Sequence, residues 1–182
     1  MNLKIFLVAF IFFFSISAKA QNYDIERSSY IKALKYNKKK NYKEFDKLKK
    51  ELVNYPLYSD LEYKSLHREK NINDDKVIEF IKKYKNSYAS EKAYVNLIYR
   101  LSSKNQIDKL ITNYKKIDSV DLHCLYLRAK IKKKSIENIG EEIIPVWLSA
   151  KSQPKSCDYI FKWFYKNKKL SDELVWQRIK LS

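Results

Sequence analysis

The sequence predicts an all-α protein, more narrowly an α-solenoid: a superhelix of stacked helix pairs, about ten helices in all. Its 182 residues include one glycine and three prolines, too few for the turns that a sheet protein needs. Apolar residues recur at steps of three and four, the period of an amphipathic helix. Three segments about 30 residues apart also share one apolar pattern, which is typical of helical repeats.

The first twenty residues have the pattern of a secretory signal peptide. Lys4 precedes an apolar block, residues 5–14, and the segment ends in the A-x-A sequence of residues 18–20. About twelve apolar residues cover only ~18 Å as a helix, less than a bilayer requires. We therefore expect cleavage after Ala20, a periplasmic location, and one domain over residues 21–182 without a membrane span. An uncleaved N-terminal anchor is the alternative.

The chain is strongly basic. It has 38 Lys and Arg against 21 Asp and Glu; loss of Lys4 and Lys19 with the signal peptide leaves 36 basic residues and a net charge of +15. Such a charge suggests a nucleic-acid partner. An exported protein is not expected to encounter nucleic acid, however, and lysine outnumbers arginine, the residue that makes most base-specific contacts. A/T-rich codons would also produce this composition. We expect no nucleic-acid partner; attraction to anionic wall or lipid surfaces is the alternative to plain solvation.

The first three helices are expected over residues 23–37, 42–54 and 57–70. Pro56 prevents the second from continuing into the third. On the first helix the apolar stripe predicts that Tyr30, Ile31, Leu34 and Ile25 are buried. The expected inward residues of the next two helices are Phe45, Leu48, Leu52, Tyr55, Leu61, Tyr63 and Leu66.

The next three helices carry the internal repeat. A polar cluster, Asn71, Asn73, Asp74 and Asp75, supplies a turn and an N-cap for the fourth helix. The fifth is expected over residues 90–101, with Tyr94, Leu97, Ile98 and Leu101 inward. A chance coincidence among frequent apolar residues is the alternative to a true repeat. The repeated triplets are Leu48, Leu52 and Tyr55; Val77, Ile81 and Tyr84; and Ile107, Ile111 and Tyr114.

Four further helices are expected towards the C-terminus. One covers residues 121–133, and the next runs from Ser135 towards Trp147, weakened by Gly140 and Pro145. Residues 152–155 open an aromatic helix with Pro154 in its first turn. Ser171 caps the last helix. The expected inward residues of the first of these helices are Leu122, Leu125, Tyr126 and Ala129. Ile160, Phe161, Trp163 and Phe164 make the third strongly aromatic.

Several motifs occur together in the C-terminal third. They read W-L-S-A-K-S-Q-P-K-S-C-D over residues 147–158 and W-Q-R-I over residues 176–179, preceded by Y-P-L-Y-S-D-L-E-Y at residues 55–63. In this order the motifs resemble the N-terminal superhelical domain of the soluble lytic murein transglycosylases. The resemblance covers residue 30 to the C-terminus. It implies a superhelical scaffold and peptidoglycan as the polymer on which the family acts.

Cys124 and Cys157 are the chain's two cysteines. An even count in an exported protein favours one disulfide, and the family resemblance implies the same pairing. Two unpaired buried thiols are the alternative.

No catalytic, cofactor or metal site is expected. His67 and His123 stand apart, and His123 beside Cys124 gives two potential ligands where a structural zinc site needs four. The adjacent carboxylates of residues 74–75 and 141–142 are interpreted as caps or solvated surface, because neighbours on a helix point in different directions. The one glycine excludes a Gly-rich phosphate loop. Most of the fifteen tyrosines are interpreted as core residues rather than sugar platforms.

The predicted function follows from the resemblance. In the family, a separate C-terminal domain cleaves murein with formation of a 1,6-anhydro product, and this chain stops before the position of that domain. We expect the chain to be a truncated scaffold, inactive alone, with part of the apolar set Val175, Trp176 and Ile179 uncovered. The alternative is a freestanding periplasmic helical-repeat module that binds a protein or the cell wall.

Overall fold

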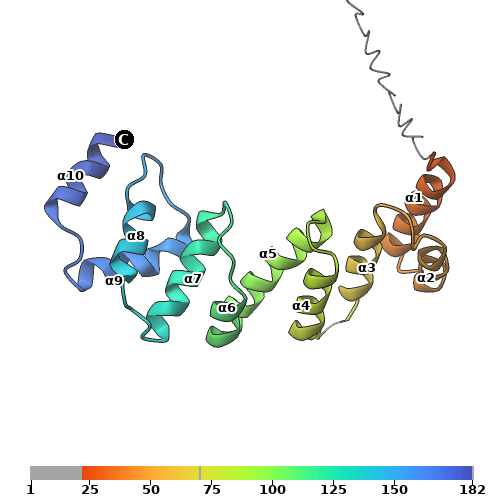
Figure 1. Ribbon diagram of the computed structural model, residues 1–182, viewed down its shortest axis with the longest axis horizontal. Coiled ribbons are helices and arrows are strands. Elements are labelled where there is room, and N and C mark those ends of the chain that lie inside the picture. The colour runs from red at the N-terminus through yellow and green to blue at the C-terminus, as the bar shows by residue number, and fades with distance from the viewer. Residues whose placement is uncertain (1–21, 70, 182) are drawn as a thin grey trace, which may run out of the picture. The chain divides into compact units, whose positions relative to one another are not determined.

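The fold is helical throughout the part of the chain described by the computed structural model, residues 22–69 and 71–181. Ten α-helices and one short 3-10 turn make up all of its regular secondary structure in these ranges (Figure 1). The all-α prediction is therefore confirmed. The predicted signal peptide, residues 1–20, lies outside the described residues.

The chain divides into two compact units, with the boundary after Tyr55. The first unit contains α1 (Asp24–Lys38) and α2 (Tyr42–Glu51), which pack against each other. Its core is formed by Ala33, Phe45 and Leu52, each at most 2% exposed. The ring of Tyr55 closes this core, with its centroid 5.4 Å from that of Tyr30.

The predicted stripe of α1 is partly wrong. Ile25 and Ile31 are 81% and 46% exposed, whereas Ala33 is fully buried. A small residue at the contact lets the backbones of two helices approach closely, so α1 turns Ala33 rather than its isoleucines towards Phe45 of α2. Apolarity alone therefore misplaced the buried face of α1.

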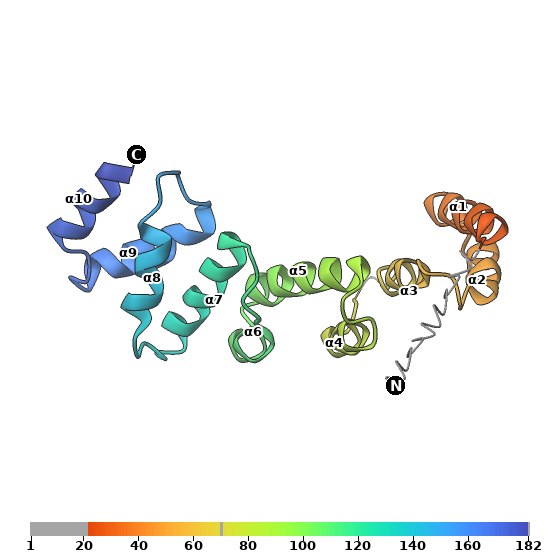
Figure 2. The same ribbon diagram turned by 45° about the horizontal axis from the view of Figure 1, so that its top comes forward.

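The second unit holds the remaining helices (Figure 2). Its helices pack in sequential pairs, α4 on α5, α6 on α7 and α8 on α9, and α5, α7 and α9 contact in turn, which is the stacking of an α-solenoid. Their bounds are α3 Tyr58–Leu66, α4 Asp74–Lys83, α5 Tyr88–Ser103, α6 Ile107–Asn113, α7 Val120–Lys132, α8 Ile139–Trp147, the 3-10 turn Lys155–Cys157, α9 Asp158–Lys166 and α10 Asp172–Leu181.

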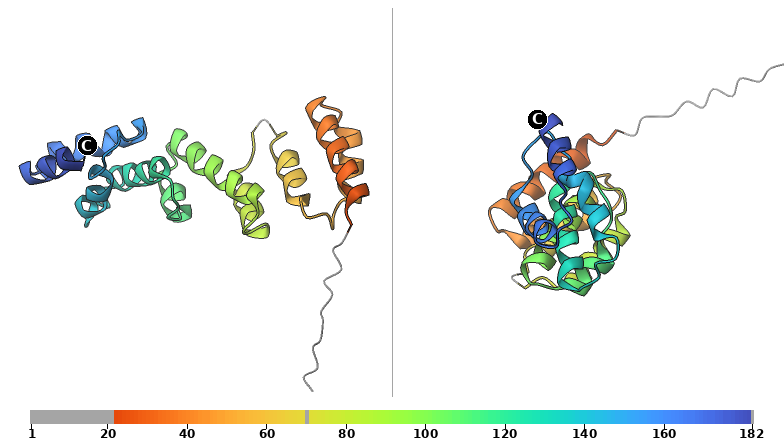
Figure 3. Two further views of the ribbon diagram at one scale, coloured as in Figure 1. Left: turned by 90° about the horizontal axis from the view of Figure 1, so that it is seen from above. Right: turned by 90° about the vertical axis from the view of Figure 1, so that its left-hand side faces the viewer.

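Helix α7 lies between two hydrophobic cores of this unit and contributes side chains to both (Figure 3). Leu122, Leu125 and Ala129 face the core shared with α4, α5 and α6. Leu127 and Ile131 face the second core, formed with α8 and α9. Burial on two faces makes α7 the helix that joins the two halves of the unit.

Local signals set most helix ends. Asn73 and Ser171 cap α4 and α10, because their side-chain oxygens accept from the backbone N–H groups of Asp75 and Leu174, as predicted. Helix α8 begins at Ile139 rather than Ser135, after Asn138 in the left-handed region with φ of 55°. Pro154 precedes a 3-10 turn instead of opening α9, so that detail of the prediction is wrong.

The repeated tyrosines of the second unit have equivalent places. Tyr84 and Tyr114 are the C-cap residues of α4 and α6, and both are partly buried. The Tyr84 hydroxyl donates to Glu62 Oε2 at 3.0 Å, and the Tyr114 hydroxyl contacts the ring of His123. In each case the ring ties the end of a helix to a neighbouring helix.

Helix α10 packs against α8 through a cation–π contact and a hydrogen bond to the same indole ring. The Arg178 guanidinium lies 4.4 Å from the Trp147 ring centroid, and the Trp147 Nε1–H donates to the Leu174 carbonyl at 3.3 Å. On the same helix Trp176 and Ile179 are 62% and 53% exposed. Exposure of part of this apolar set was predicted, and it is confirmed.

Candidate functional site

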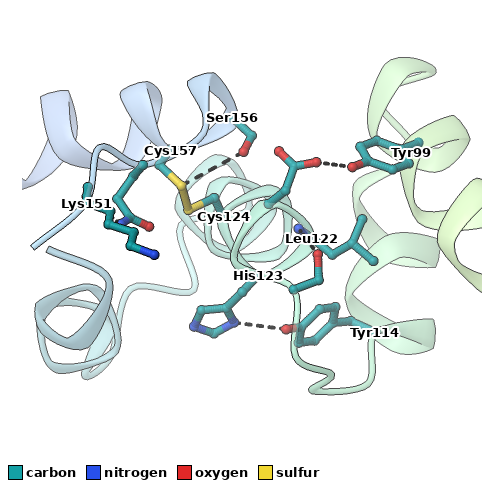
Figure 4. Close-up of a disulfide and its surroundings, with 11 residues drawn as sticks. Tyr99, Tyr114, Leu122, His123, Cys124, Lys151, Ser156 and Cys157 are labelled. Atoms are coloured by element: carbon teal, nitrogen blue, oxygen red, sulfur yellow. Dashed lines mark hydrogen bonds between the residues drawn. A yellow bond between two sulfur atoms is a disulfide. The ribbon is translucent and has the colours of Figure 1, made fainter. Parts of the chain in front are cut away.

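The two cysteines meet where α7 and the turn before α9 pack together (Figure 4). Cys124 and Cys157 are both fully buried, and the structure joins their Sγ atoms in a disulfide with 4.9 Å between the Cα atoms. Ser119 caps the first turn of α7 by accepting from the Leu122 N–H, and the Pro154 carbonyl accepts from the Cys157 N–H at 2.9 Å. These local bonds fix both backbones beside the sulfur atoms.

A hollow of about 700 Å³ lies beside this junction. Its walls come from the α6–α7 loop, from α7, from α8 and from the segment after α8. Aromatic, aliphatic and charged side chains are mixed in it, which is typical of a binding surface rather than of a packed core. The lining residues that enter the argument are Tyr114, Lys116, His123, Tyr126, Glu142 and Gln153.

Three rings form one wall of the hollow. Tyr114 and Tyr126 stack in parallel with centroids 4.1 Å apart, and the Tyr114 hydroxyl lies 3.0 Å from His123 Nδ1. Burial raises the pKa of Tyr114 to about 12. Burial also lowers the pKa of His123, and Lys116 and Lys130 lower it further against the opposing effect of Glu142. The wall is therefore uncharged near neutral pH.

Two carboxylates line this hollow, the exposed Asp118 and the partly buried Glu142. Glu142 forms an ion pair with Lys130, whose side chain is only 16% exposed. Glu142 is thus not the solvated residue that the sequence suggested, whereas Glu141 is exposed in the first turn of α8 as expected. An ion-paired carboxylate accepts hydrogen bonds, whereas the general acid of a glycosidase must carry a proton to donate.

Asp74 also departs from its predicted place. Its side chain is 7% exposed, and Arg100 Nε donates to its Oδ1 at 2.6 Å, whereas neighbouring Asp75 is 65% exposed and pairs with Lys109. Both ion pairs connect α4 with the α5–α6 region. Asp74 is therefore a buried tie within the stack rather than a solvated surface residue.

The histidines and tyrosines divide between core and surface. The His67 ring packs against the Tyr63 ring at an interplanar angle of 49°, with 4.0 Å between the centroids, and burial lowers the pKa of His67. Tyr63 and Tyr94 are buried as predicted, but Tyr88 and Tyr165 are 76% and 73% exposed. Within the described ranges, no group of three or more His, Cys, Asp or Glu is arranged to hold a metal ion.

Solved structures share this fold. The 70-kDa soluble lytic transglycosylase of Escherichia coli matches 88% of this chain with a TM-score of 0.76 and 22% identity, and the 70-kDa soluble lytic transglycosylase solved with bulgecin A matches 88% with a TM-score of 0.77 and 22% identity. An inactive mutant of the lytic transglycosylase Slt of Pseudomonas aeruginosa matches 84% with a TM-score of 0.74 and 25% identity. The chain has the fold of the soluble lytic transglycosylases. The resemblance seen in the sequence motifs is thereby confirmed.

The match covers only part of each lytic transglycosylase. This chain spans 26% of the two 70-kDa chains and 25% of the Pseudomonas aeruginosa chain. No protein-family model and no curated protein sequence matches it. Among the described residues, no helix is both long and apolar enough to cross a membrane.

Sequence reasoning missed the hollow itself. His123, Tyr126 and Lys130 follow one another at steps of three and four on α7, so their common face could have been recognised. The partners of that face lie on other elements, Tyr114 before α7 and Glu142 after it. Nothing in the linear pattern fixed those distances, because they depend on how α6 and α8 pack against α7.

Proposed function

We propose that this chain is the helical scaffold portion of a periplasmic lytic transglycosylase, the class of enzyme that cleaves peptidoglycan strands. The fold shared with 88% coverage at a TM-score of 0.77 is the observation that carries the proposal. The sequence motifs at residues 147–158 and 176–179 support it independently of the fold. The localisation rests on the signal peptide predicted for residues 1–20.

In this proposal the chain itself contributes no cleavage chemistry. Glu142 is already paired with Lys130 and Asp74 with Arg100, while Asp118 in the lining of the hollow is exposed to solvent. Retaining and inverting glycosidases need two carboxyl groups that flank the scissile bond, one of them protonated. A scaffold with these ion pairs supports an attached or associated catalytic domain through its shape and rigidity.

The proposal is tested by an activity gel that contains murein. The purified chain, loaded beside a lytic transglycosylase as positive control, is expected to leave no cleared band. A cleared band at the mass of this chain would refute the proposal. A Glu142→Gln variant in the next lane serves to exclude a contaminating hydrolase, since contamination clears both lanes alike.

A freestanding binding module is the second candidate function. The hollow of about 700 Å³ beside α7 favours it, because scaffold packing alone does not require an open site with stacked aromatic rings. Sedimentation with insoluble murein tests this candidate. Lys116→Ala with Gln153→Ala, both in the lining, should release the chain, while Lys92→Ala with Gln177→Ala, both exposed elsewhere, should not. Equal sedimentation of the two variants would rule out the hollow as the binding site.

A further inference from the structure

We propose that one edge of the second unit, here called the lysine edge, adsorbs to an anionic lipid bilayer surface. The lysine edge consists of the α7–α8 turn and the α9–α10 turn with the adjoining ends of α7 and α9, and it carries exposed lysines and two exposed apolar side chains. Its members are Lys132, Lys133, Lys134, Ile136, Tyr165, Lys166, Lys168 and Lys169.

The two turns are neighbours in space. Ile136 and Lys169 line the same hollow of about 410 Å³, together with the first residues of α8. A Cβ added to Gly140 would lie 4.0 Å from Lys169 Cδ, so the start of α8 lies beside the turn between α9 and α10. Both turns lie on the lower side of the second unit in Figure 1, opposite the α4–α5 turn. Charges far apart in sequence are therefore presented together.

Among the described residues, one of the six lysines of this edge forms an ion pair. All six lysines are exposed, and among them Lys133 pairs with Asp108 while Lys132 donates to the Asn105 amide oxygen. Within residues 22–69 and 71–181, no ion pair involves Lys134, Lys168 or Lys169. The nearby acids in sequence are Glu137 and Glu141 after the first turn and Asp172 and Glu173 after the second. Lysines near an anionic bilayer each contribute additively to adsorption.

Two exposed apolar side chains distinguish a bilayer from a soluble polyanion. Ile136 is 47% exposed between lysines of the first turn, and Tyr165 is 73% exposed beside Lys166 at the end of α9. Tyrosine is favoured at membrane interfaces, where its ring meets lipid and its hydroxyl meets water. A polyanion in solution gains nothing from an exposed isoleucine, whereas the acyl boundary of a bilayer does.

The backbone of both turns gives a further reason to consider function. Lys134 and Lys168 adopt left-handed conformations, with φ of 61° and 54°, at positions after a helix end where glycine is preferred. Lys40 in the first unit does the same, with φ of 59°, so this feature alone does not define the edge. Its combination with Ile136 and Tyr165 does.

Co-sedimentation with lipid vesicles tests the proposal. The chain from Gln21 is used, so that the apolar block of residues 5–14 cannot insert by itself. Vesicles of phosphatidylcholine with about one-third phosphatidylglycerol should bind the chain at low ionic strength, and vesicles of phosphatidylcholine alone should not. Binding should weaken steeply as salt is raised towards 0.5 M, because the Debye length falls. Equal binding to both vesicle types would overturn the proposal.

Matched variants locate the surface. Neutralising Lys134, Lys168 and Lys169 to Gln should lower the partition coefficient by about two orders of magnitude, roughly fivefold for each lysine. Neutralising Lys82, Lys85 and Lys92, which are exposed elsewhere in the same unit, changes the net charge equally and should lower it by no more than about twofold. Equal losses in the two triple variants would mean that net charge, not this edge, drives binding, and would refute the proposal.

A third variant separates bilayer from polyanion. Ile136→Ser with Tyr165→Ser leaves the charge unchanged and should lower vesicle binding at least about tenfold, since both side chains lose their apolar contact. Far-UV circular dichroism of each variant confirms that it is folded. If this variant binds vesicles like the parent chain, adsorption is purely electrostatic, a soluble polyanion is the better partner, and the bilayer proposal fails.

Discussion

The disulfide between α7 and the turn before α9 gives the sharpest stability prediction. It closes a segment with a sequence separation of 33 residues. In the chain-entropy model, such a loop restricts the unfolded chain enough to stabilise the native state by about 3.7 kcal/mol. Reduction of the parent chain removes this term but keeps both sulfur atoms in place. With a urea m-value of roughly 2 kcal/mol/M, the midpoint of the second unit should fall by about 2 M.

The double variant Cys124→Ala with Cys157→Ala separates the crosslink from packing. Both cysteines are fully buried in the core with α8 and α9. Removal of their sulfur atoms should lower the free energy of unfolding by about another 1 to 2 kcal/mol beyond reduction. Urea unfolding followed by circular dichroism measures both steps, and reductant must leave the double variant unchanged. Two reactive thiols in the denatured, unreduced chain, or no midpoint shift on reduction, would refute the reasoning.

Three further predictions follow from the second unit. Asp74→Ala removes the ion partner of Arg100, whose side chain is 18% exposed, so the free energy of unfolding should fall by about 3 kcal/mol or more. Asp75→Ala, at the exposed neighbour, should lower it by under about 1 kcal/mol in the same urea assay. Equal losses in the two variants would contradict burial of the Asp74–Arg100 pair. Burial lowers the pKa of His123 in the folded chain. The contribution of His123 to stability is therefore fully present above the unfolded pKa of about 6.5 and is lost as pH falls through the lower folded pKa. His123→Gln should flatten this part of the curve of stability against pH, and an unchanged slope would contradict the prediction. Lys134 has a φ of 61°, so Lys134→Gly should raise the free energy of unfolding by about 0.5 to 1 kcal/mol. Lys133 has a φ of −74°, so Lys133→Gly should lower it. The opposite order would show that backbone strain does not decide stability at this turn.

Periodicity predicted the core of the second unit well. Leu97, Ile98, Leu101 and Leu122 were all expected inward and are at most 1% exposed. These residues lie on helices that pack on both sides, where almost any apolar residue at the right step becomes buried. The same rule failed on α1, because a single partner helix left it free to choose a face around the small Ala33.

The candidate site was less predictable than the fold. Cys124 and Cys157 could be paired from composition because the chain has only two cysteines. Composition could not predict the ion pairs Asp74–Arg100 and Lys130–Glu142, since the two residues of each pair lie on different helices, 26 and 12 residues apart in the sequence. Adjacent acids that look alike in sequence, such as Asp74 and Asp75, separate into buried and exposed only when neighbouring helices are placed.

The lysine edge also illustrates what composition hides. The excess of lysine suggested genome bias or plain solvation, and no lysine-rich segment of the sequence was given a function. Packing of α7 to α9 brings two lysine-rich turns together, and Ile136 and Tyr165, which adjoin these turns in sequence, are exposed. A partner surface of this kind arises from the tertiary fold, so charge counting along the chain could not detect it.

The central proposal is that this chain is a helical scaffold without lytic chemistry of its own. The most direct test is chromatography of the soluble fragments released from purified murein. The chain is added at several concentrations, and a lytic transglycosylase serves as the reference. We predict no release above the buffer control at any concentration. Release of 1,6-anhydro fragments in proportion to the amount of this chain would contradict the claim.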